Sequence, residues 1–182
     1  MNCSKSRGTQ IKKGFESGKA DLVLFLHADS TVNESGITEL LSAFNKNNTL
    51  AWGVLGHGYK KASLNLRFIN LLNKIRFYLS GIAFGDQGIF ARRIIIEKNG
   101  GFPDIPIMED VELSLRLFIY PGKKLGHLIE VSARRWAGKN FIGKIIEIFV
   151  NCFIYLILRA LGFNINKISL WIFRKYYSLS SQ

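Results

Sequence analysis

The sequence predicts an α/β fold. Segments with apolar residues three or four positions apart, as in helices, alternate along the chain with short continuous apolar runs, as in buried strands. The 182 residues suffice for one domain with a buried core, and the hydrophobic content of 48% with only 3 prolines argues against disorder. No internal repeat or low-complexity segment interrupts the alternation.

The first expected elements are a helix over residues 7–18 and a strand over residues 22–26. Ile11 and Phe15 lie one helical turn apart, and Gly18 is a typical helix stop. Residues 22–26 form an unbroken apolar run, which predicts a central strand buried on both faces of a sheet. Polar residues after this strand would lie at its carboxyl end, where open α/β sheets form their ligand crevices.

The later segments continue the alternation, with glycine or proline at several of the boundaries. This order of elements is typical of a sheet with helices on its faces. In sequence, we expect a helix over 34–47, a strand over 50–59 interrupted by glycines, a basic helix over 64–79, a strand over 88–92, a short helix over 93–99, a helix over 108–120 and a strand over 124–131.

The formal net charge of +12, from 25 basic and 13 acidic residues, calls for an anionic partner or surface. Nucleic acid, anionic lipid and a phosphorylated substrate would each meet this need. The basic residues are scattered over the helices and the C-terminal segment, and no nucleic-acid-binding motif is present. We therefore expect no nucleic-acid partner.

The cysteines and the N-terminal residues predict a cytoplasmic protein. Cys3 and Cys152 are far apart and have no metal-ligand spacing, which is typical of free thiols in a reducing compartment. Residues 1–19 are polar and basic and lack the apolar core of a signal peptide.

The segment from residue 142 to residue 163 is dense in isoleucine, leucine and phenylalanine. Its longest stretch without a formal charge is residues 148–158, shorter than the roughly 20 residues that a spanning helix needs. At helical spacing its polar positions form one narrow stripe, made of Lys144, Glu147, Asn151, Tyr155 and Arg159.

Basic and aromatic residues follow this stretch, as in helices that lie at a lipid headgroup layer. We therefore divide the chain into a domain over residues 1–138 and a hydrophobic, basic helical segment over residues 139–182 that associates with the inner face of a membrane. A helix packed on the sheet domain is the alternative.

Candidate chemistry is concentrated in residues 85–117. Glu109 and Asp110 lie at the expected start of a helix, where the exposed N–H groups and the helix dipole favour negative charge, so we expect both to stay ionised. A carboxylate held in this way could act as a general base, bind a hydroxyl group or join a metal site. The alternative is that these residues, with Glu112, only cap and solubilise the helix.

Two other places carry candidate ligand-binding groups. Asp29 follows the first strand and could hold Mg²⁺ or Mn²⁺, which prefer oxygen ligands, and His27 could add a ligand. Asp86 and Gln87 lie between glycines that let a ligand approach the backbone, and they supply acceptor and donor groups for sugar hydroxyls. A simple polar turn is the alternative at both places.

Arg134, Arg135 and Trp136 place two guanidinium groups beside an indole. Arginine pairs bidentately with phosphate, and an indole can stack on a sugar or another ring. A basic surface patch is the alternative.

Taken in order, the segments HADS, GDQGIF, GGFPDIPIMEDVELSLRL and SARRW resemble those of inverting glycosyltransferases of family 2, which have the GT-A fold. The similarity runs from residue 7 to residue 136 and is nearest to a small bacterial subgroup described as selenium- or radical-SAM-associated transferases. The resemblance implies a Rossmann-like three-layer sandwich that transfers a sugar from a nucleotide-sugar donor, with inversion at the anomeric carbon. The acceptor is unknown, with lipid-linked and cell-envelope molecules as candidates.

The resemblance also assigns roles to the polar residues. Asp29 matches the metal-binding aspartate, and Asp110 matches the catalytic base, with Glu109 beside it. Asp86 and Gln87 match the turn that contacts the donor and the acceptor. Arg7, Gln10 and Gly14 match the helix that follows the nucleotide-binding strands. Further donor or acceptor contacts are implied for Arg7, Gln10, Arg134, Arg135 and Trp136.

Two departures from the family pattern matter. His27 stands where the first motif position is often aspartate, so metal binding depends on Asp29. The strand–loop–strand that grips the nucleobase in the family has no counterpart before Arg7, so we expect a GT-A sheet that lacks its first strands. A truncated, non-catalytic remnant or a partner subunit is therefore the alternative to an active enzyme.

Overall fold

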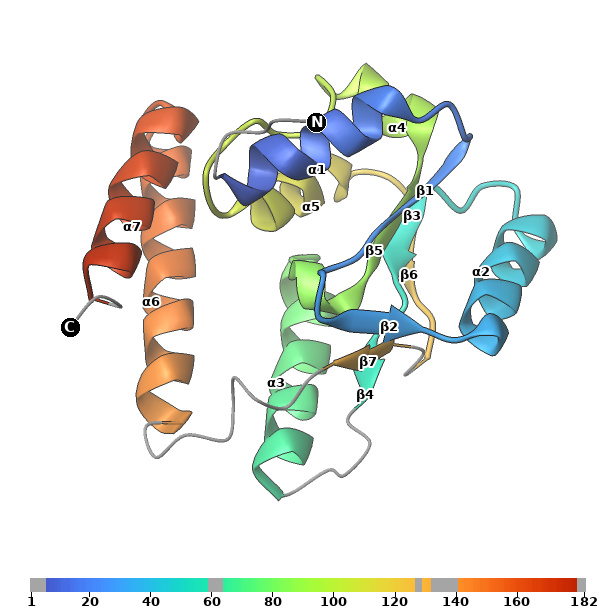
Figure 1. The fold of residues 1–182 in the computed structure, drawn as a ribbon, viewed down its shortest axis with the longest axis horizontal. Helices are drawn as coiled ribbons and strands as arrows, with labels where there is room; N and C mark the ends of the chain where they lie inside the picture. The colour runs from blue at the N-terminus through green and yellow to red at the C-terminus, as the bar shows by residue number, and fades with distance from the viewer. Residues whose placement is uncertain (1–5, 59–63, 127–128, 132–140, 180–182) are drawn as a thin grey trace.

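The computed structural model describes residues 6–58, 64–126, 129–131 and 141–179. Its centre is a four-stranded sheet in the order β1-β5-β3-β6 (Figure 1). Strand β5 runs antiparallel to both of its neighbours, whereas β3 and β6 are parallel. The strand bounds are β1 Leu22–Phe25, β3 Trp52–Val54, β5 Ile89–Arg92 and β6 Gly122–Lys124.

Helices pack on both faces of this sheet, which confirms the predicted α/β class. Helix α2 (Glu34–Lys46) covers one face, where Leu40 and Phe44 are buried against Phe90 of β5. The other face is covered by α1 (Arg7–Ser17), α3 (Leu64–Ser80), α4 (Arg93–Lys98) and α5 (Glu109–Leu117). Each of these five helices matches a predicted helix, because its apolar residues recur at helical spacing.

A second, smaller sheet contains β2 (Ser30–Val32), β7 (Ile129–Val131) and β4 (His57–Gly58), in that order. The predictions of single strands over 50–59 and 124–131 are therefore wrong, because each stretch is divided between the two sheets. Gly56 turns the chain at the first division. It has φ 75°, a left-handed conformation that favours glycine, and a Cβ at this position would overlap the carbonyl oxygen of Gly126.

Strand β1 lies at the edge of the sheet among the described strands, with β5 as its one neighbour, so the predicted central position is wrong. Its side chains nevertheless pack on both faces. Leu22 and Leu24 join the core under α2, and Phe25 joins the core on the opposite face. The apolar run thus indicates that both faces of the strand are buried. The position of the strand in the sheet depends instead on pairing with distant parts of the chain.

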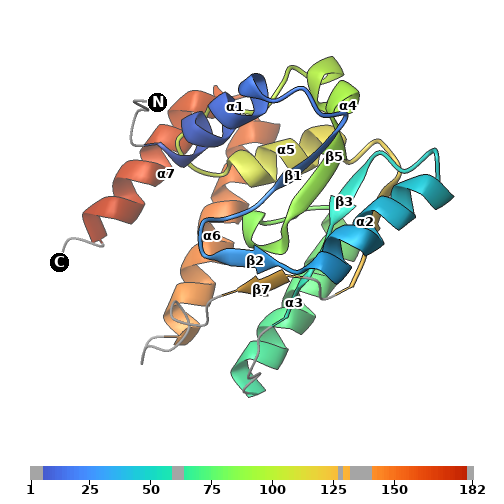
Figure 2. The same cartoon turned by 45° about the vertical axis from the view of Figure 1, so that its right-hand side comes forward.

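Helices α6 (Phe141–Ala160) and α7 (Ile165–Leu179) lie on the side of α1 and α5, away from α2 (Figure 2). Tyr155 of α6 and Ile172 of α7 are buried in one cluster with Val111 of α5. The two C-terminal helices therefore share a core with the sheet domain. The predicted division between residues 138 and 139 falls outside the described residues.

Helix α6 turns three residues of its predicted polar stripe toward the protein. Asn151 and Tyr155 are buried, and Arg159 forms an ion pair with Glu112 of α5. An ordinary amphipathic helix does the opposite and buries its apolar side. The large exposed side chains in the described part of α6 are apolar, namely Ile146, Phe149, Val150, Phe153 and Ile157.

Helix α3 carries a second set of exposed apolar side chains, namely Phe68, Leu71, Ile75, Tyr78 and Leu79. Exposed apolar surface on this scale is typical of an interaction site. None of the helices within the described residues is long and apolar enough to cross a membrane.

Candidate active site

The site is built around the first turn of α5. Met108, the residue before the helix, has φ 66°, a left-handed conformation that is uncommon outside glycine. The Asp110 carboxylate then accepts two backbone hydrogen bonds, from Val111 N to Oδ1 at 2.8 Å and from Gly85 N to Oδ2 at 2.8 Å. Asp110 therefore satisfies a free N–H group in the first turn of its own helix and also fixes that helix to the short helical turn η1 (Gly85–Gln87).

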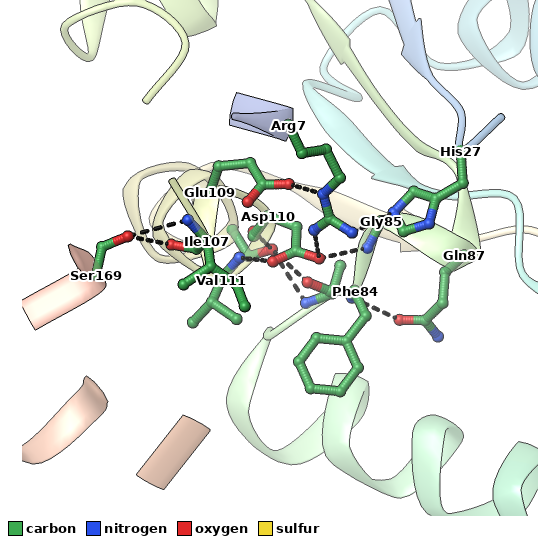
Figure 3. A network of polar contacts seen from close by, with 12 residues as sticks. Arg7, His27, Phe84, Gly85, Gln87, Ile107, Glu109, Asp110, Val111 and Ser169 are labelled. Carbon is green, nitrogen blue, oxygen red and sulfur yellow. Dashed lines mark hydrogen bonds and ion pairs between the residues drawn. The ribbon is translucent and has the colours of Figure 1, made fainter. Parts of the chain in front are cut away.

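Arg7 of α1 connects the two carboxylates with the end of β1 (Figure 3). Its Nε donates to Glu109, its Nη2 donates to Asp110 Oδ2 at 3.3 Å, and its Nη1 donates to His27 Nε2 at 3.1 Å. Because an arginine can only donate, Nε2 of His27 must accept, so the ring is neutral. Burial and then the charge of Arg7 lower the pKa of His27, in agreement with a neutral ring.

Gly85 allows this close approach because it has no side chain. A Cβ at this position would overlap the imidazole of His27 and lie 3.4 Å from Asp110 Oδ2. The glycine before Asp86 was predicted to admit a ligand to the backbone, but in the structure it admits a neighbouring protein side chain.

Glu109 has a different environment from Asp110. Its side chain is only 1% exposed, and its Oε2 has no hydrogen-bond partner in the part of the chain that the structure describes. Burial, followed by repulsion from Asp110, raises the pKa of Glu109 to about 7, although Arg7 opposes the shift. Desolvation therefore opposes the helix dipole at Glu109, an effect that the sequence prediction of two ionised carboxylates did not include.

A pocket of about 140 Å³ lies beside Asp110, between α3, α5 and α6. Of the two predicted catalytic carboxylates, Asp110 lines this pocket and Glu109 is buried behind it. Most of the wall is apolar and comes from α3, α6 and the loop before α5. The charged and imidazole side chains in the wall are Arg7, His27, Arg76, Asp86 and Asp110.

Arg76 is a site residue that sequence reasoning missed. It belongs to α3, which was predicted only as a basic helix, and its guanidinium lies 3.5 Å from the centre of the Phe84 ring. Gln87, predicted to contact ligand, is fully buried and supports Arg76 instead. Its Oε1 accepts from Arg76 Nη2 at 3.0 Å and from Phe84 N at 3.1 Å.

Two of the other predicted site residues, Asp29 and Gln10, do not line the pocket. Asp29 is exposed in the turn between β1 and β2, where Ser30 donates to its carboxylate at 3.5 Å. Gln10 is exposed on α1. Arg134, Arg135 and Trp136 lie outside the described residues.

No metal centre is preformed among the side chains that the structure describes. Groups of three or more His, Cys, Asp or Glu side chains in a metal-binding arrangement are absent from this part of the chain. Asp29 could contribute one carboxylate ligand, whereas Nε2 of His27 is occupied by Arg7.

Comparison with known proteins identifies the fold. No protein-family model matches the sequence, and no curated protein is significantly similar to it. A solved structure titled as a mycobacterial protein superposes with a TM-score of 0.54 at 11% identity, over 85% of this chain and 52% of the other. Glucosyl-3-phosphoglycerate synthase from Mycobacterium tuberculosis, in complex with Mn²⁺, uridine diphosphate and phosphoglyceric acid, superposes with a TM-score of 0.53 at 12% identity, over 85% of this chain and 55% of the synthase.

The chain therefore has the GT-A-like fold of a glycosyltransferase and spans about half the length of these two structures. At such low identity the likeness establishes the fold. The reaction, the donor and the metal must be argued from the residues of this chain.

Proposed function

We propose that this protein is an inverting glycosyltransferase of family 2, of the selenium- or radical-SAM-associated subgroup, that acts at the cytoplasmic face of a membrane. The observation that carries the proposal is the Asp110 carboxylate, held by Gly85, Val111 and Arg7 in the wall of a pocket. General-base catalysis requires a carboxylate fixed next to a space that can hold the reacting hydroxyl. The GT-A-like fold supports a nucleotide-sugar donor.

In the proposed reaction an acceptor oxygen attacks the anomeric carbon of the donor sugar. The new carbon–oxygen bond forms as the bond from that carbon to the diphosphate breaks, and the hydroxyl proton passes to Asp110. Arg7 positions the base, because it bonds both Asp110 and the buried Glu109. Attack from the face opposite the leaving group inverts the configuration.

Asp29 is the proposed protein ligand for Mg²⁺ or Mn²⁺. These ions are commonly held by one or two carboxylates and take further ligands from substrate phosphates and water, which suits a single exposed aspartate. When bound, such an ion supplies positive charge for the departing diphosphate. Arg134 and Arg135 are proposed to assist there, and Asp86 and Trp136 to contact the sugar or the acceptor.

Donor binding tests this proposal. Calorimetric titration of the full chain with UDP-glucose and GDP-mannose should show binding to at least one donor that strengthens when Mn²⁺ is added. Replacement of Asp29 by Asn should remove the Mn²⁺ effect, whereas Asp21→Asn, an exposed aspartate before β1, should leave it unchanged. Absence of binding to any nucleotide sugar would instead favour a non-catalytic remnant or a partner subunit.

Membrane association is proposed from the exposed apolar sides of α3 and α6. These two helices flank the pocket, so lipid at their surfaces would bring a lipid-linked acceptor close to Asp110. The net charge of +12 favours anionic headgroups. The inward orientation of the polar stripe on α6 supports this proposal, since it leaves the apolar side as the outer surface.

Replacement of Leu79 on α3 and Phe153 on α6 by Glu should release the protein from vesicles of phosphatidylglycerol and phosphatidylcholine. The two side chains are 80% and 64% exposed, so the changes should cost little stability. Vesicle cosedimentation measures the effect. Leu41→Glu on α2, where the leucine is 50% exposed on the far side of the sheet, is the matched control. Equal sedimentation of all the variants would contradict the assignment.

A further inference from the structure

Arg76 forms no direct ion pair among the described residues, although the charges of Asp86 and Asp110 act on it from further away. Its Nε donates to the carbonyl of Ile82 at 3.2 Å and its Nη2 donates to Gln87, but its Nη1 is buried and has no hydrogen-bond partner among the described residues. Within the described residues, no carboxylate lies at ion-pair distance from Arg76, whereas Arg7 contacts two. Burial lowers the pKa of Arg76 to about 10, which still leaves the guanidinium charged at neutral pH.

A buried charge without a partner is costly, and a bound anion would compensate it. The guanidinium lines the same pocket as Asp110, so an anion placed on Arg76 would lie in the proposed acceptor site. Phosphate fits this group well, because the planar fork of arginine can donate two parallel hydrogen bonds to it.

The rest of the wall selects an apolar ligand. Leu72, one turn before Arg76 on α3, faces Ile145, Ile148 and Phe149 of α6 across the pocket. The outward sides of both helices are also apolar, so a hydrocarbon chain leaving the pocket would remain in contact with apolar surface. A sugar phosphate or an inorganic anion would gain nothing from these walls.

We propose that this pocket binds a phosphate group attached to a hydrocarbon chain, with the phosphate on Arg76 and the chain between α3 and α6. Such an amphiphile is the acceptor class for the proposed transfer, and in that respect the inference rests on the proposed function. Asp86 and Asp110 line the same pocket and repel a phosphate. Arg7 also lines it but is paired with Glu109 and Asp110, so Arg76 is the group that makes phosphate binding favourable.

Binding of monomeric amphiphiles to the full chain, measured by calorimetry without a sugar donor, tests the inference. Farnesyl phosphate should bind at least about tenfold more tightly than farnesol and than inorganic phosphate, the factor expected for one charge-assisted hydrogen bond. A short-chain phosphatidylglycerol distinguishes the source of the phosphate. Preference for it indicates a phospholipid headgroup, and preference for farnesyl phosphate indicates a lipid monophosphate. Equal binding of farnesol, or of inorganic phosphate, would overturn the inference.

Two variants connect the binding with Arg76. Arg76→Gln should weaken farnesyl phosphate binding at least about tenfold. The matched control is Arg92→Gln, because Arg92 likewise donates to backbone carbonyls and stacks on a phenylalanine, Phe44. This control variant should bind farnesyl phosphate as tightly as the wild type does. Unchanged binding by the Arg76 variant would contradict the inference.

The variant Leu72→Glu leaves Arg76 in place. It therefore tests the inference even if replacement of Arg76 unfolds the protein. A glutamate four residues before an arginine on a helix forms an intrahelical ion pair, so it would occupy the guanidinium and compete with phosphate. Binding of farnesyl phosphate should fall while the melting temperature is maintained. Retained binding would overturn the inference.

The outcome separates this inference from the proposed function. Arg76-dependent binding of farnesyl phosphate without any sugar transfer would support the amphiphile site and count against the transferase. Sugar transfer to an acceptor without a phosphate, unaffected by the Arg76 variant, would support the transferase and remove the amphiphile site.

Discussion

Replacement of Asp110 by Asn should lower the turnover of sugar transfer by at least about 100-fold, because general-base catalysis contributes on the order of 10²–10⁴-fold. The amide has nearly the same shape, and its one oxygen can still accept from Gly85 or from Val111, which bond different oxygens of the carboxylate, but it cannot take up the acceptor proton. The measurement is the steady-state rate of nucleotide release at saturating donor.

Two comparisons make the Asp110 result specific. Donor affinity should change little in Asp110→Asn, since the proposed base contacts the acceptor. Glu97→Gln on the exposed side of α4 should retain the wild-type rate. A rate within threefold of wild type in the Asp110 variant (about 0.65 kcal/mol in the barrier) would remove Asp110 from the role of base.

Replacement of Glu112 by Ala should lower the free energy of unfolding by about 3–5 kcal/mol, the usual result of breaking a buried ion pair. The Glu112 side chain is only 3% exposed and accepts hydrogen bonds from Arg116 at 2.9 Å, Tyr155 at 2.9 Å and Arg159 at 2.7 Å. Two of these donors belong to α6, so the variant should also loosen α6 from α5. Urea denaturation measures the loss.

The effect of Glu112 should also depend on pH. Burial alone would raise its pKa, but the hydrogen bonds from Arg159, Arg116 and Tyr155 outweigh burial and lower it below the ordinary 4.5. Its stabilising contribution is therefore complete above pH 4.5 and is lost as the pH falls through the folded-state pKa. The difference between wild type and Glu112→Ala should shrink accordingly in acid. The raised pKa of Glu109 changes the stability with pH in the opposite direction. Because Glu109 is present in both proteins, its contribution cancels from the difference between them.

The exposed pair of Lys12 and Glu16 is the control for Glu112. Their charged groups lie 3.8 Å apart and the Glu16 side chain is 58% exposed, so Glu16→Ala should change stability by less than about 1 kcal/mol. An equally small effect of Glu112→Ala would show that α6 does not depend on this contact.

Local sequence patterns were sufficient to predict most helices. The spacing of Ile11 and Phe15 predicted α1, and the apolar face of residues 34–47 predicted α2. Strand order was not predictable in this way, because β1 pairs with β5 across more than sixty residues of sequence, Leu22 with Arg92. An apolar run specifies what covers a strand and leaves its neighbours undetermined.

The site was predicted in part. Asp110, Asp86, Arg7 and His27 were each singled out in the sequence, and the structure brings all four to one pocket. Their mutual contacts were not predictable, since Arg7 meets Asp110 from 103 positions away. The pKa of Glu109 was missed for the same reason, because it depends on burial under α1.

Arg76 was missed because its helix is rich in basic residues, and Lys74 two positions earlier is exposed. One sequence signal was present. Arg76 lies four residues after Leu72 and next to Phe77, so helical spacing places it on the side of α3 that packs. A basic residue on the apolar side of a helix is a candidate ligand contact even where the neighbouring charges are solvated.

Proton NMR of the anomeric region tests the central claim most directly. The full chain would be incubated with Mn²⁺, an α-linked nucleotide sugar such as UDP-glucose and farnesyl phosphate in lipid vesicles. We predict a new anomeric signal with the large coupling of a β-linked glucoside, formed as the donor signal decays, because single displacement at the anomeric carbon inverts its configuration. A product with the small coupling of an α-linkage would contradict the account, as would a donor signal that stays constant with every nucleotide sugar and acceptor tried.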